Sequence, residues 1–430
     1  MYLNTFLITF GFEPNDFINE LVEPFKTDAG ITLYNIRQKT DRIPCPNCGC
    51  LGSYINDYYW IETRCTSNSG NPTIIRIKKV RFKCKTCGKT FSPIIHGIER
   101  YAKINKLVND LIVKEFFKQK SFSIIAIDYD VSCHQVMNIF DRTFPIVRRK
   151  NLPRALCIDE IGFKTEDGNY AAIIYDHDKK VIVDVIRNRK IDYLRHYFWQ
   201  CSFYERNNVK YFISDLYEGY STIKEEFFKG AIHIADMFHV IRLLKYEVSR
   251  LRVETYKEYT DEHDVERSFM KNYWDVFEKY LDVKTARKPY YCKTEKREYT
   301  TWEMMRRCLS LNPIFWDAFA CLQDFYDYWK CKTYDQAILH IEKVVKQLMR
   351  TGNDNLIKVA KTYWKWRSEI ANAITVRNEE GKRYSNGPAE GLNNAIKTLI
   401  KDANGYRNFD RLRKRILLVL NYGKDPSPIV

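Results

Sequence analysis

The pattern of apolar and polar positions changes character several times along the chain. Short β-prone runs such as "TIIRIKKVRF" come first, a helical period follows, strand and helix patterns then alternate, and a long charged and aromatic stretch shows little strand character. Period-two alternation indicates strands, and recurrence at three and four residues indicates helices. The pattern predicts segments at 1–98, 99–150, 151–240, 241–375 and 376–423, with a loose tail at 424–430.

The segment at 151–240 predicts a mixed sheet. Three apolar runs, "ALCID", "NYAAIIYD" and "KKVIVDVI", are typical of a meander of strands. A helical period in "DYLRHYFWQC" follows, and "VKYFISD" and "AIHIAD" predict two more buried strands. Three of the strands end in an acid, at Asp159, Asp215 and Asp236. This order predicts a ribonuclease-H-like core in which Asp159 and Asp215 lie side by side.

These acids have a chemical consequence. A carboxylate in apolar surroundings is costly unless it is solvated, paired or bound to a cation, and a cation also relieves the repulsion between neighbouring carboxylates. Glu390 follows a Pro/Gly-marked turn, opens a helix rich in lysine and arginine, and can reach the same place. Three carboxylates can hold two ions roughly 3.5–4 Å apart. Hard oxygen ligands predict Mg²⁺ or Mn²⁺.

The segment at 99–150 predicts a helix-turn-helix. A helical apolar period in "NKLVNDLIVKEFFKQ" is followed by a short helix that Ser123 can cap, with Ile124, Ala126 and Ile127 on its buried side. "DYDV" makes a turn, and Ser132 can cap a second helix. The outward-facing residues of that helix are the predicted DNA contacts: His134, Gln135, Asn138 and Arg142.

Local charge agrees with DNA binding in this segment. From Arg100 to Arg154 the chain has 11 Lys and Arg residues against 5 Asp and Glu residues, an excess that suits phosphate contacts. The alternative is an ordinary packing unit of three helices.

Two matched cysteine turns stand in the first segment. "CPNCG" contains Cys45 and Cys48, and "CKTCG" contains Cys84 and Cys87. Such turns direct thiolates at one ion, and four thiolates form the closed tetrahedral site of a structural zinc. The 35 residues between them exceed the usual spacing, and a β-hairpin formed by "TIIRIKKVRFKC" can fill the gap as in a zinc ribbon. Redox dithiols are the alternative, but no βαβ pattern surrounds either turn.

Composition narrows the class of protein. The chain is 45% hydrophobic and 15% aromatic, so it is globular. A net charge of +16 suggests a polyanionic partner, of which DNA and RNA are the commonest. Neither a signal peptide nor a membrane span is expected, which predicts a cytoplasmic protein with reduced thiols. Cys50 and Cys65 are expected to be non-ligands.

Several blocks of sequence resemble one family. "IDEIGF", "ISDLYEGY", "IADMFHVIRLLK" and "SNGPAEGLNNAIKTLIKDANGYRNFDRLRKRIL" are similar to bacterial insertion-sequence transposases of the ISL-three type, and so is the order of zinc knuckles, helix-turn-helix and core. The resemblance covers about residues 40–420. It implies a DDE transposase with Asp159, Asp215 and Glu390 as the catalytic triad, and with DNA cleavage and strand transfer as its reactions.

The resemblance also implies partners and cofactors. The expected partner is double-stranded DNA, both the terminal inverted repeats of the transposon and the target. Catalysis would require Mg²⁺ or Mn²⁺, and Zn²⁺ would be structural. A homodimer is expected because two ends must be paired, and the bacterial protein would be associated with the nucleoid when bound to DNA.

Some residues keep two interpretations. Glu160 could substitute for its neighbour Asp159. Asp236 is an accessory carboxylate or a helix cap, and His239 touches substrate or packs. Three basic residues contact transposon-end phosphates or simply form a solvated helical face: Lys397, Lys401 and Arg407.

The predicted fold class is α/β multidomain, with an N-terminal zinc ribbon, a helix-turn-helix and a ribonuclease-H-like mixed sheet interrupted by a large all-helical insertion at 241–375. Two other functions fit the same pattern. One is a DNA-binding regulator with an inactive core, and the other is a ribonuclease-H-like nuclease that cuts without joining.

Overall fold

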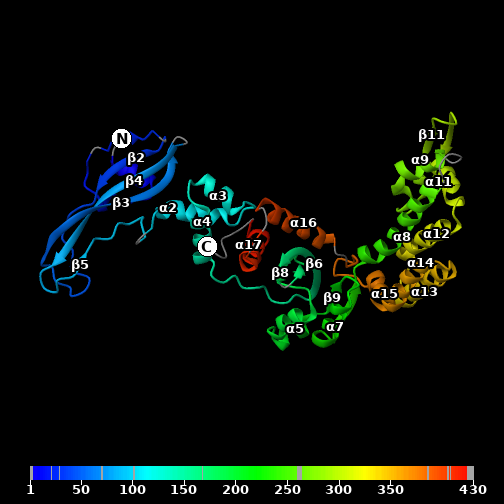
Figure 1. Cartoon of the computed structure of the whole chain (residues 1–430). Helices are drawn as coiled ribbons and strands as arrows, with labels where there is room; N and C mark the ends of the chain where they lie inside the picture. The colour runs from blue at the N-terminus through cyan, green and yellow to red at the C-terminus, as the bar shows by residue number, and fades with distance from the viewer. Residues whose placement is uncertain are drawn as a thin grey trace. The chain divides into compact units, whose positions relative to one another are not determined.

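The computed structural model of the chain (Figure 1) describes residues 3–20, 22–28, 30–68, 71–99, 102–166, 168–258, 264–384, 387–403, 406 and 408–423. Within these ranges the side chains of residues 3, 68, 71, 165 and 387–390 are outside the description. The contacts divide the chain into two compact units. Unit 1 comprises residues 1–148 and 396–430, and unit 2 comprises residues 149–395.

A five-stranded sheet forms the first part of unit 1. Its order is β1-β2-β4-β3, with β5 paired to β4. The strands β3 and β4 are long and antiparallel, whereas β2 runs parallel to β4. Apolar residues of helix α1 and of the sheet form one buried cluster. The elements are α1 (Leu3–Thr9), η1 (Pro14–Asp16), β1 (Pro24–Lys26), β2 (Thr32–Arg37), β3 (Ser53–Asn68), β4 (Asn71–Cys84) and β5 (Thr90–Phe91).

The expected hairpin between the cysteine turns exists, but its assignment to "TIIRIKKVRFKC" is wrong. That stretch is a single strand within β4, and its partner is the whole of β3. The turn between the strands therefore comes earlier than expected. The reason is that residues 53–68 carry few uninterrupted apolar runs, so only their pairing with β4 identifies them as a strand.

Four helices lie wholly in the second part of unit 1: α2 (Lys106–Glu115), α3 (Phe122–Asp128), α4 (Cys133–Thr143) and α17 (Phe409–Tyr422). Their core is aromatic, with the rings of Phe116 and Phe140 centred 5.1 Å apart. Arg415 of α17 is fully buried and donates hydrogen bonds to the carbonyl oxygens of Phe116, Lys118 and Lys120 at the end of α2. The last helix of the chain is thus part of the same packed group as α2–α4.

The predicted cap of α3 is wrong by two residues. Ser121, and not Ser123, accepts a hydrogen bond from the backbone N–H of Ile124. The shift turns Ile124 and Ile127 outward and leaves Ala126 buried. The cap of α4 at Ser132 is as predicted, and it forms a reciprocal capping box with Gln135.

A five-stranded mixed sheet opens unit 2, in the order β10-β9-β6-β7-β8. The strands β6, β7 and β8 pair antiparallel as a meander, whereas β9 is parallel to β6 and β10 is parallel to β9. The elements are β6 (Ala155–Thr165), β7 (Gly168–Asp176), β8 (Val181–Ile186), α5 (Ile191–Trp199), α6 (Phe203–Asn208), β9 (Tyr211–Ser214), α7 (Glu218–Phe227) and β10 (Ile232–Ala235).

The expected end of the first core strand at Asp159 is wrong. β6 continues to Thr165 because β7 remains paired with it. Its pairing with β9, in contrast, ends at Cys157. Asp159 therefore lies inside β6, just past the point where one of the two neighbouring strands has stopped.

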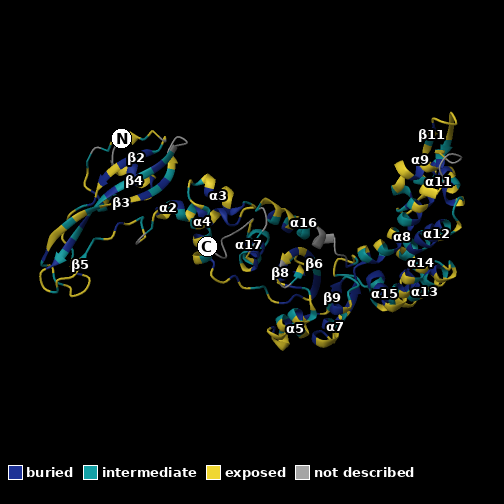
Figure 2. Ribbon diagram, viewed as in Figure 1, coloured by how far each residue is buried: buried dark blue, intermediate teal, exposed yellow. Residues whose placement is uncertain are grey.

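The two faces of this sheet pack in separate cores, coloured dark blue in Figure 2. Side chains alternate between faces along a strand. Leu156 and Ile158 of β6 pack with residues of α5 and α7, whereas Ala155 and Cys157 pack in the core that includes helix α8. Asp159 continues the second series, so it lies on the face that α8 covers.

The insertion is mainly helical, and its core is continuous with one face of the sheet. The expectation that it is all-helical is wrong, because β11 and β12 form an antiparallel hairpin. Its elements are α8 (Met237–Glu258), α9 (Asp264–Asn272), η2 (Trp274–Phe277), α10 (Val283–Ala286), β11 (Pro289–Cys292), β12 (Arg297–Thr300), α11 (Thr301–Ser310), α12 (Pro313–Tyr326), η3 (Asp327–Lys330), α13 (Tyr334–Arg350), α14 (Asp354–Lys365) and α15 (Arg367–Thr375).

Helix α16 (Gly387–Asp402) begins in unit 2 and continues into unit 1. Among the helices of the described residues, none combines the length and the apolar character that crossing a membrane requires.

Candidate active site and zinc centre

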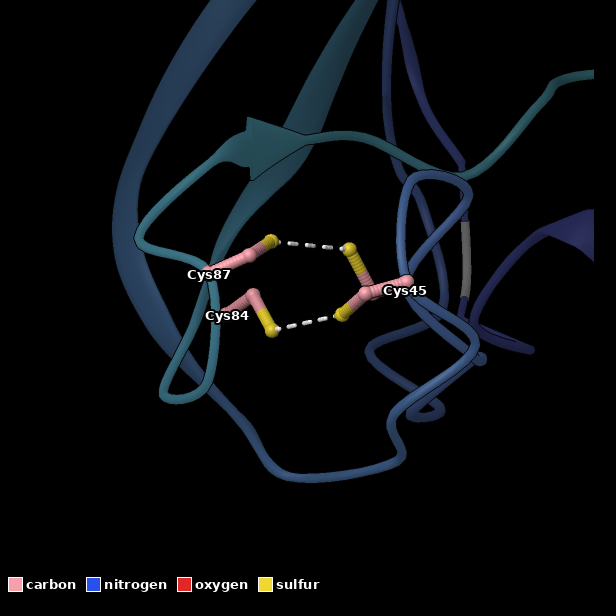
Figure 3. Close-up of side chains that lie close together, drawn as sticks. Cys45, Cys84 and Cys87 are labelled. Atoms are coloured by element: carbon pink, nitrogen blue, oxygen red, sulfur yellow. Dashed lines mark hydrogen bonds between the residues drawn. The ribbon is translucent and has the colours of Figure 1, made fainter.

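Two cysteine turns bring four thiols together in unit 1. The ligand atoms of Cys45, Cys48, Cys84 and Cys87 all lie within 4.8 Å of one another. Cys45 Sγ lies 3.7 Å from Cys87 Sγ (Figure 3), and Cys48 Sγ lies 3.6 Å from Cys84 Sγ. Among the described residues, the group of three or more Cys, His, Asp or Glu side chains close enough to share a metal ion consists of these four cysteines. Four thiolates fit a structural Zn²⁺.

The two turns have the same local geometry. The backbone N–H of Gly49 donates to the carbonyl of Cys45 over 2.8 Å, and that of Gly88 donates to the carbonyl of Cys84 over 3.1 Å. Both glycines have φ near +70°, at 72° and 71°, which costs glycine little. Hydrogen bonding from the backbone of Lys89 lowers the pKa of Cys87 to about 7, favouring the thiolate that binds metal.

Two further thiols lie outside this group. Cys50 Sγ accepts hydrogen bonds from the hydroxyl of Thr86, at 3.0 Å, and from the backbone N–H of Gly52, at 3.2 Å. Cys65 is buried in the sheet, and burial raises the pKa of its thiol. Neither belongs to the cluster of four.

Helix α4 carries the four residues predicted to contact DNA. His134 and Asn138 are exposed and lie 3.2 Å apart, from Nδ1 to Nδ2. Gln135 Oε1 accepts from the backbone N–H of Ser132 at 3.1 Å, so this side chain completes the helix cap. Arg142 is exposed and lies 3.3 Å from the carboxylate of Glu99. Of the four side chains, Gln135 is engaged in the helix cap and Arg142 lies beside an acid, whereas His134 and Asn138 are exposed and contact each other.

Three acids lie near the point where the parallel strands of the core sheet stop pairing with one another. Cys157 of β6 is opposite Ile213 of β9, and continuing this register by two residues brings Asp159 opposite Asp215. The register of β9 and β10 in the same way brings Asp236 opposite Asp215. Adjacent strands are about 4.8 Å apart. The extended register thus places the three acids in a row, called here the carboxylate row. Asp215 and Asp236 directly follow β9 and β10, and Asp159 lies within β6 where its pairing with β9 has ended.

Burial changes the electrostatics of this row. It raises the pKa of Asp159, and it raises that of Asp215 to about 6. The nearby imidazole of His239 opposes both increases. Asp159 Oδ1 accepts from the backbone N–H of Glu160 at 2.8 Å, and Asp215 Oδ1 accepts from that of Tyr217 at 3.1 Å. Both carboxylates are therefore held in place by the main chain.

Asp236 and Glu160, the two acids with more than one predicted role, have different contacts. Asp236 is only 2% exposed. Its Oδ1 accepts from the backbone N–H of Phe238 at 3.2 Å, which caps α8, and its Oδ2 lies 2.8 Å from Nδ1 of His239. That hydrogen bond raises the pKa of His239. Glu160 alternates to the opposite face of β6 from Asp159 and forms an ion pair with Arg189.

Helix α16 reaches the carboxylate row through an amide that the sequence did not single out. Asn393 Nδ2 donates to Asp159 Oδ2 over 2.8 Å. Glu390 stands three residues earlier on the same helix, but its side chain lies outside the described residues. The spacing of three residues from Glu390 was the available signal, because residues so spaced share a helix face.

Of the three basic residues predicted beside the active site, two lie among the described residues. Lys397 and Lys401 are exposed on the part of α16 that belongs to unit 1. Arg407 lies outside the described residues.

Comparisons with known families agree with these features. Residues 156–416 match a family described as a transposase, of the ISL3 DDE type. Residues 41–87 match a family described as the zinc-finger of transposase IS204/IS1001/IS1096/IS1165. A search of curated proteins found no match.

These matches define the class of protein as a DNA-binding transposase with a zinc ribbon. Because the first match spans more than half of the chain, the protein belongs to the ISL3 family of DDE transposases. The expectation of an enzyme that cleaves DNA and transfers strands is confirmed. The zinc-finger match and the cluster of four cysteines support the expected structural zinc.

Proposed function

We propose that Asp159, Asp215 and Glu390 are the catalytic triad and that the sheet of unit 2 is a ribonuclease-H-like core. The observation that carries the proposal is the parallel pairing of β6 with β9, whose register, extended two residues past Cys157 and Ile213, aligns Asp159 with Asp215. The hydrogen bond from Asn393 to Asp159 supports the third member, because it joins the helix of Glu390 to the carboxylate row. A meander of three strands followed by two parallel strands also supports this core.

The donor set fits Mg²⁺ or Mn²⁺. Asp159, Asp215 and Glu390 would hold the ions through carboxylate oxygens, which these ions prefer. Asp159 and Asp215 are half-buried, and burial raises the pKa of both carboxyl groups. A bound cation would relieve the cost of ionising them. When bound, two ions stabilise the attacking and leaving oxygens of an in-line displacement.

The residues of the chain orient the reacting groups in this scheme. Glu160 and Asn393 hold the two oxygens of Asp159, and Asp236 holds His239 beside the row. A water molecule attacks the phosphodiester at the transposon end and releases a 3′-hydroxyl, which then attacks target DNA by the same geometry. Positioning and charge neutralisation suffice for such a transfer, so no covalent intermediate with the chain is required.

The helices α2–α4 are the proposed helix-turn-helix that binds the terminal inverted repeats. Support comes from the cap and turn geometry of α3 and α4 and from the exposed His134 and Asn138 near the start of α4. A recognition helix contacts base edges with its first turns. The proposed phosphate contacts are Arg142, Lys397, Lys401 and Arg407. For Gln135 the main proposed role is to cap α4, and contact with a base is secondary.

The proposed functional segments are the zinc ribbon in 1–98, the helix-turn-helix in 99–150, the core in 151–240 with 376–423, and the helical insertion in 241–375. Contacts group the end of the core segment with the helix-turn-helix instead. A homodimer on paired ends is proposed because each transposon has two ends. The site of action would be nucleoid DNA in the bacterial cytoplasm.

A strand-transfer assay tests this function. Labelled duplexes carrying the inverted repeats that flank the reading frame are incubated with target plasmid and Mg²⁺. The wild-type protein is expected to nick and join them. Asp159→Asn should bind the repeats and leave them intact, whereas Asp192→Asn, at an exposed acid of the same unit, should act as the wild type does.

Other outcomes would favour other functions. Repeat binding with no metal-dependent nicking by the wild type would point to a regulator. Nicking without joined products would point to a nuclease.

A further inference from the structure

The β3–β4 hairpin has an outer face that the zinc site does not use. Residues opposite one another on paired strands share a face. Thr63 and its partner Ile75 are fully buried on the inner face. On the other face, Trp60 is opposite Lys78 and Glu62 is opposite Arg76. This surface, with Tyr58, is called here the outer hairpin face.

Aromatic rings and cations alternate on the outer hairpin face. Tyr58 is 47% exposed and Trp60 is 48% exposed, although both are large and apolar. Lys78 Nζ lies 5.0 Å from the ring centre of Tyr58, and the guanidinium of Arg76 lies 5.7 Å from that of Trp60. Such contacts hold flexible cations in place. The rings thus hold two positive charges close to the surface of the sheet.

The charge of the hairpin is strongly positive. Residues 53–84 contain six Lys or Arg residues and two acids. Glu62 pairs with Arg76 at 3.0 Å, and the pair is exposed on both sides, so it is weak. Lys78 has no carboxylate partner among the described residues. The uncompensated charge attracts a polyanion.

The outer hairpin face continues to the start of helix α4. Arg64, on the same face of β3, forms an ion pair with Asp130 in the turn before α4. A groove of about 720 Å³ lies here, lined from the strands by Glu62 and Arg64 and from α4 by Ser132 and Gln135.

Backbone hydrogen bonds join the hairpin to the residues that lead into α2. The backbone N–H of Arg64 donates to Lys103 over 2.9 Å, and that of Asn105 donates to Arg64 over 3.0 Å. Asn105 is fully buried and caps α2. These hydrogen bonds connect the hairpin to the start of α2 within unit 1.

We propose that the outer hairpin face binds the sugar–phosphate backbone of the same DNA duplex whose base edges helix α4 contacts. Arg76 and Lys78 would contact phosphates, and Tyr58 and Trp60 would position them. This rests on the proposed binding of terminal repeats by α4, and it adds a second surface, outside the helix-turn-helix. Its contribution is independent of DNA sequence, since phosphates carry no sequence information.

Equilibrium binding of the full-length, zinc-loaded protein tests the proposal. Fluorescence anisotropy is measured with a terminal-repeat duplex and a scrambled duplex over a range of salt. The logarithm of the association constant falls linearly with the logarithm of the salt concentration, and each lost phosphate contact makes this slope shallower by about 0.9. Near 0.1 M salt, one lost contact corresponds to about eightfold weaker binding. Arg76→Ala and Lys78→Ala should each show this loss on both duplexes.

Three further variants separate charge from folding. Lys78→Arg should restore both affinity and salt slope. Glu62→Gln should bind DNA more tightly than the wild type, a gain that damaged folding cannot produce. Lys26→Ala is the matched control, because Lys26 is exposed on β1 at the opposite edge of the same sheet, and it should bind as the wild type does.

The results distinguish this inference from the proposed function. If the wild type shows no preference for the terminal repeat over the scrambled duplex, end recognition by α4 is refuted. If it shows the preference while Arg76→Ala and Lys78→Ala match Lys26→Ala, the outer hairpin face does not bind DNA. Equal losses in Lys78→Ala and Lys78→Arg would also overturn the inference, because packing and not charge would then be responsible.

Discussion

Replacing Asp215 with asparagine tests the electrostatics of the carboxylate row. Burial raises the pKa of Asp215 from 3.8 to about 6 in the folded protein. At about 1.4 kcal/mol per tenfold change, ionising this group in the metal-free protein costs up to roughly 3 kcal/mol of folding free energy. Partial solvation makes that figure an upper bound. Asp215→Asn removes the cost, so it should stabilise unit 2 while abolishing cleavage.

The sign of the pH dependence follows from linkage. An acid with a higher pKa in the folded state binds its proton more tightly there, so the folded state has its full stability below the unfolded pKa. The wild type should lose this stability as the pH rises from about 4 to about 6. Above that range the difference between wild type and Asp215→Asn should be constant.

Thermal unfolding of the full chain in EDTA measures the effect. For a unit of this size, each kcal/mol changes the midpoint by about 2–4 °C. Asp215→Asn should therefore unfold up to about 6–12 °C above the wild type near pH 8, and at the same temperature near pH 4. Asp192→Asn, at a side chain that is 86% exposed, is the matched control and should change the midpoint little.

Metal provides the second half of the experiment. Mg²⁺ should raise the midpoint of the wild type and leave that of Asp215→Asn nearly unchanged, because binding to the folded state alone stabilises it. If Asp215→Asn unfolds at or below the wild-type temperature near pH 8, the buried carboxylate does not destabilise the fold and the reasoning is refuted.

Three other changes have defined outcomes. Cys84→Ser should abolish zinc binding, measured by metal content, and should expose the hairpin to proteolysis. The reason is that structural zinc contributes about 10–16 kcal/mol of folding free energy. Zinc retained at full occupancy would contradict the four-thiolate site. Arg415→Met should destabilise unit 1 by at least about 2 kcal/mol in urea unfolding, because it leaves buried carbonyls without donors, whereas Lys414→Met should cost little. Asn393→Ala should lower cleavage and spare binding of DNA, and unchanged cleavage would show that Asp159 does not need this amide.

Local patterns accounted for much of the fold. Alternating apolar runs predicted β7 and β8, and the capping sequence at Ser132 predicted α4, because both depend on residues close together in the chain. The two C-x-x-C-G turns predicted the thiolate cluster, since each turn is complete in itself. The cap of α3 was misplaced because Ser121 and Ser123 are equally good local candidates, and only packing of Phe122 into the helical core distinguishes them.

The sequence by itself determined which acids come directly after buried apolar runs and which cysteines share a turn, because the cost of burying charge and the geometry of short turns are local properties. The tertiary structure alone decided what those residues contact. It carried β6 past Asp159, brought Asn393 to Asp159 across 234 residues of chain, and buried Arg415 against the end of α2. Such contacts join distant segments through packing of the whole unit, which no short window of sequence encodes.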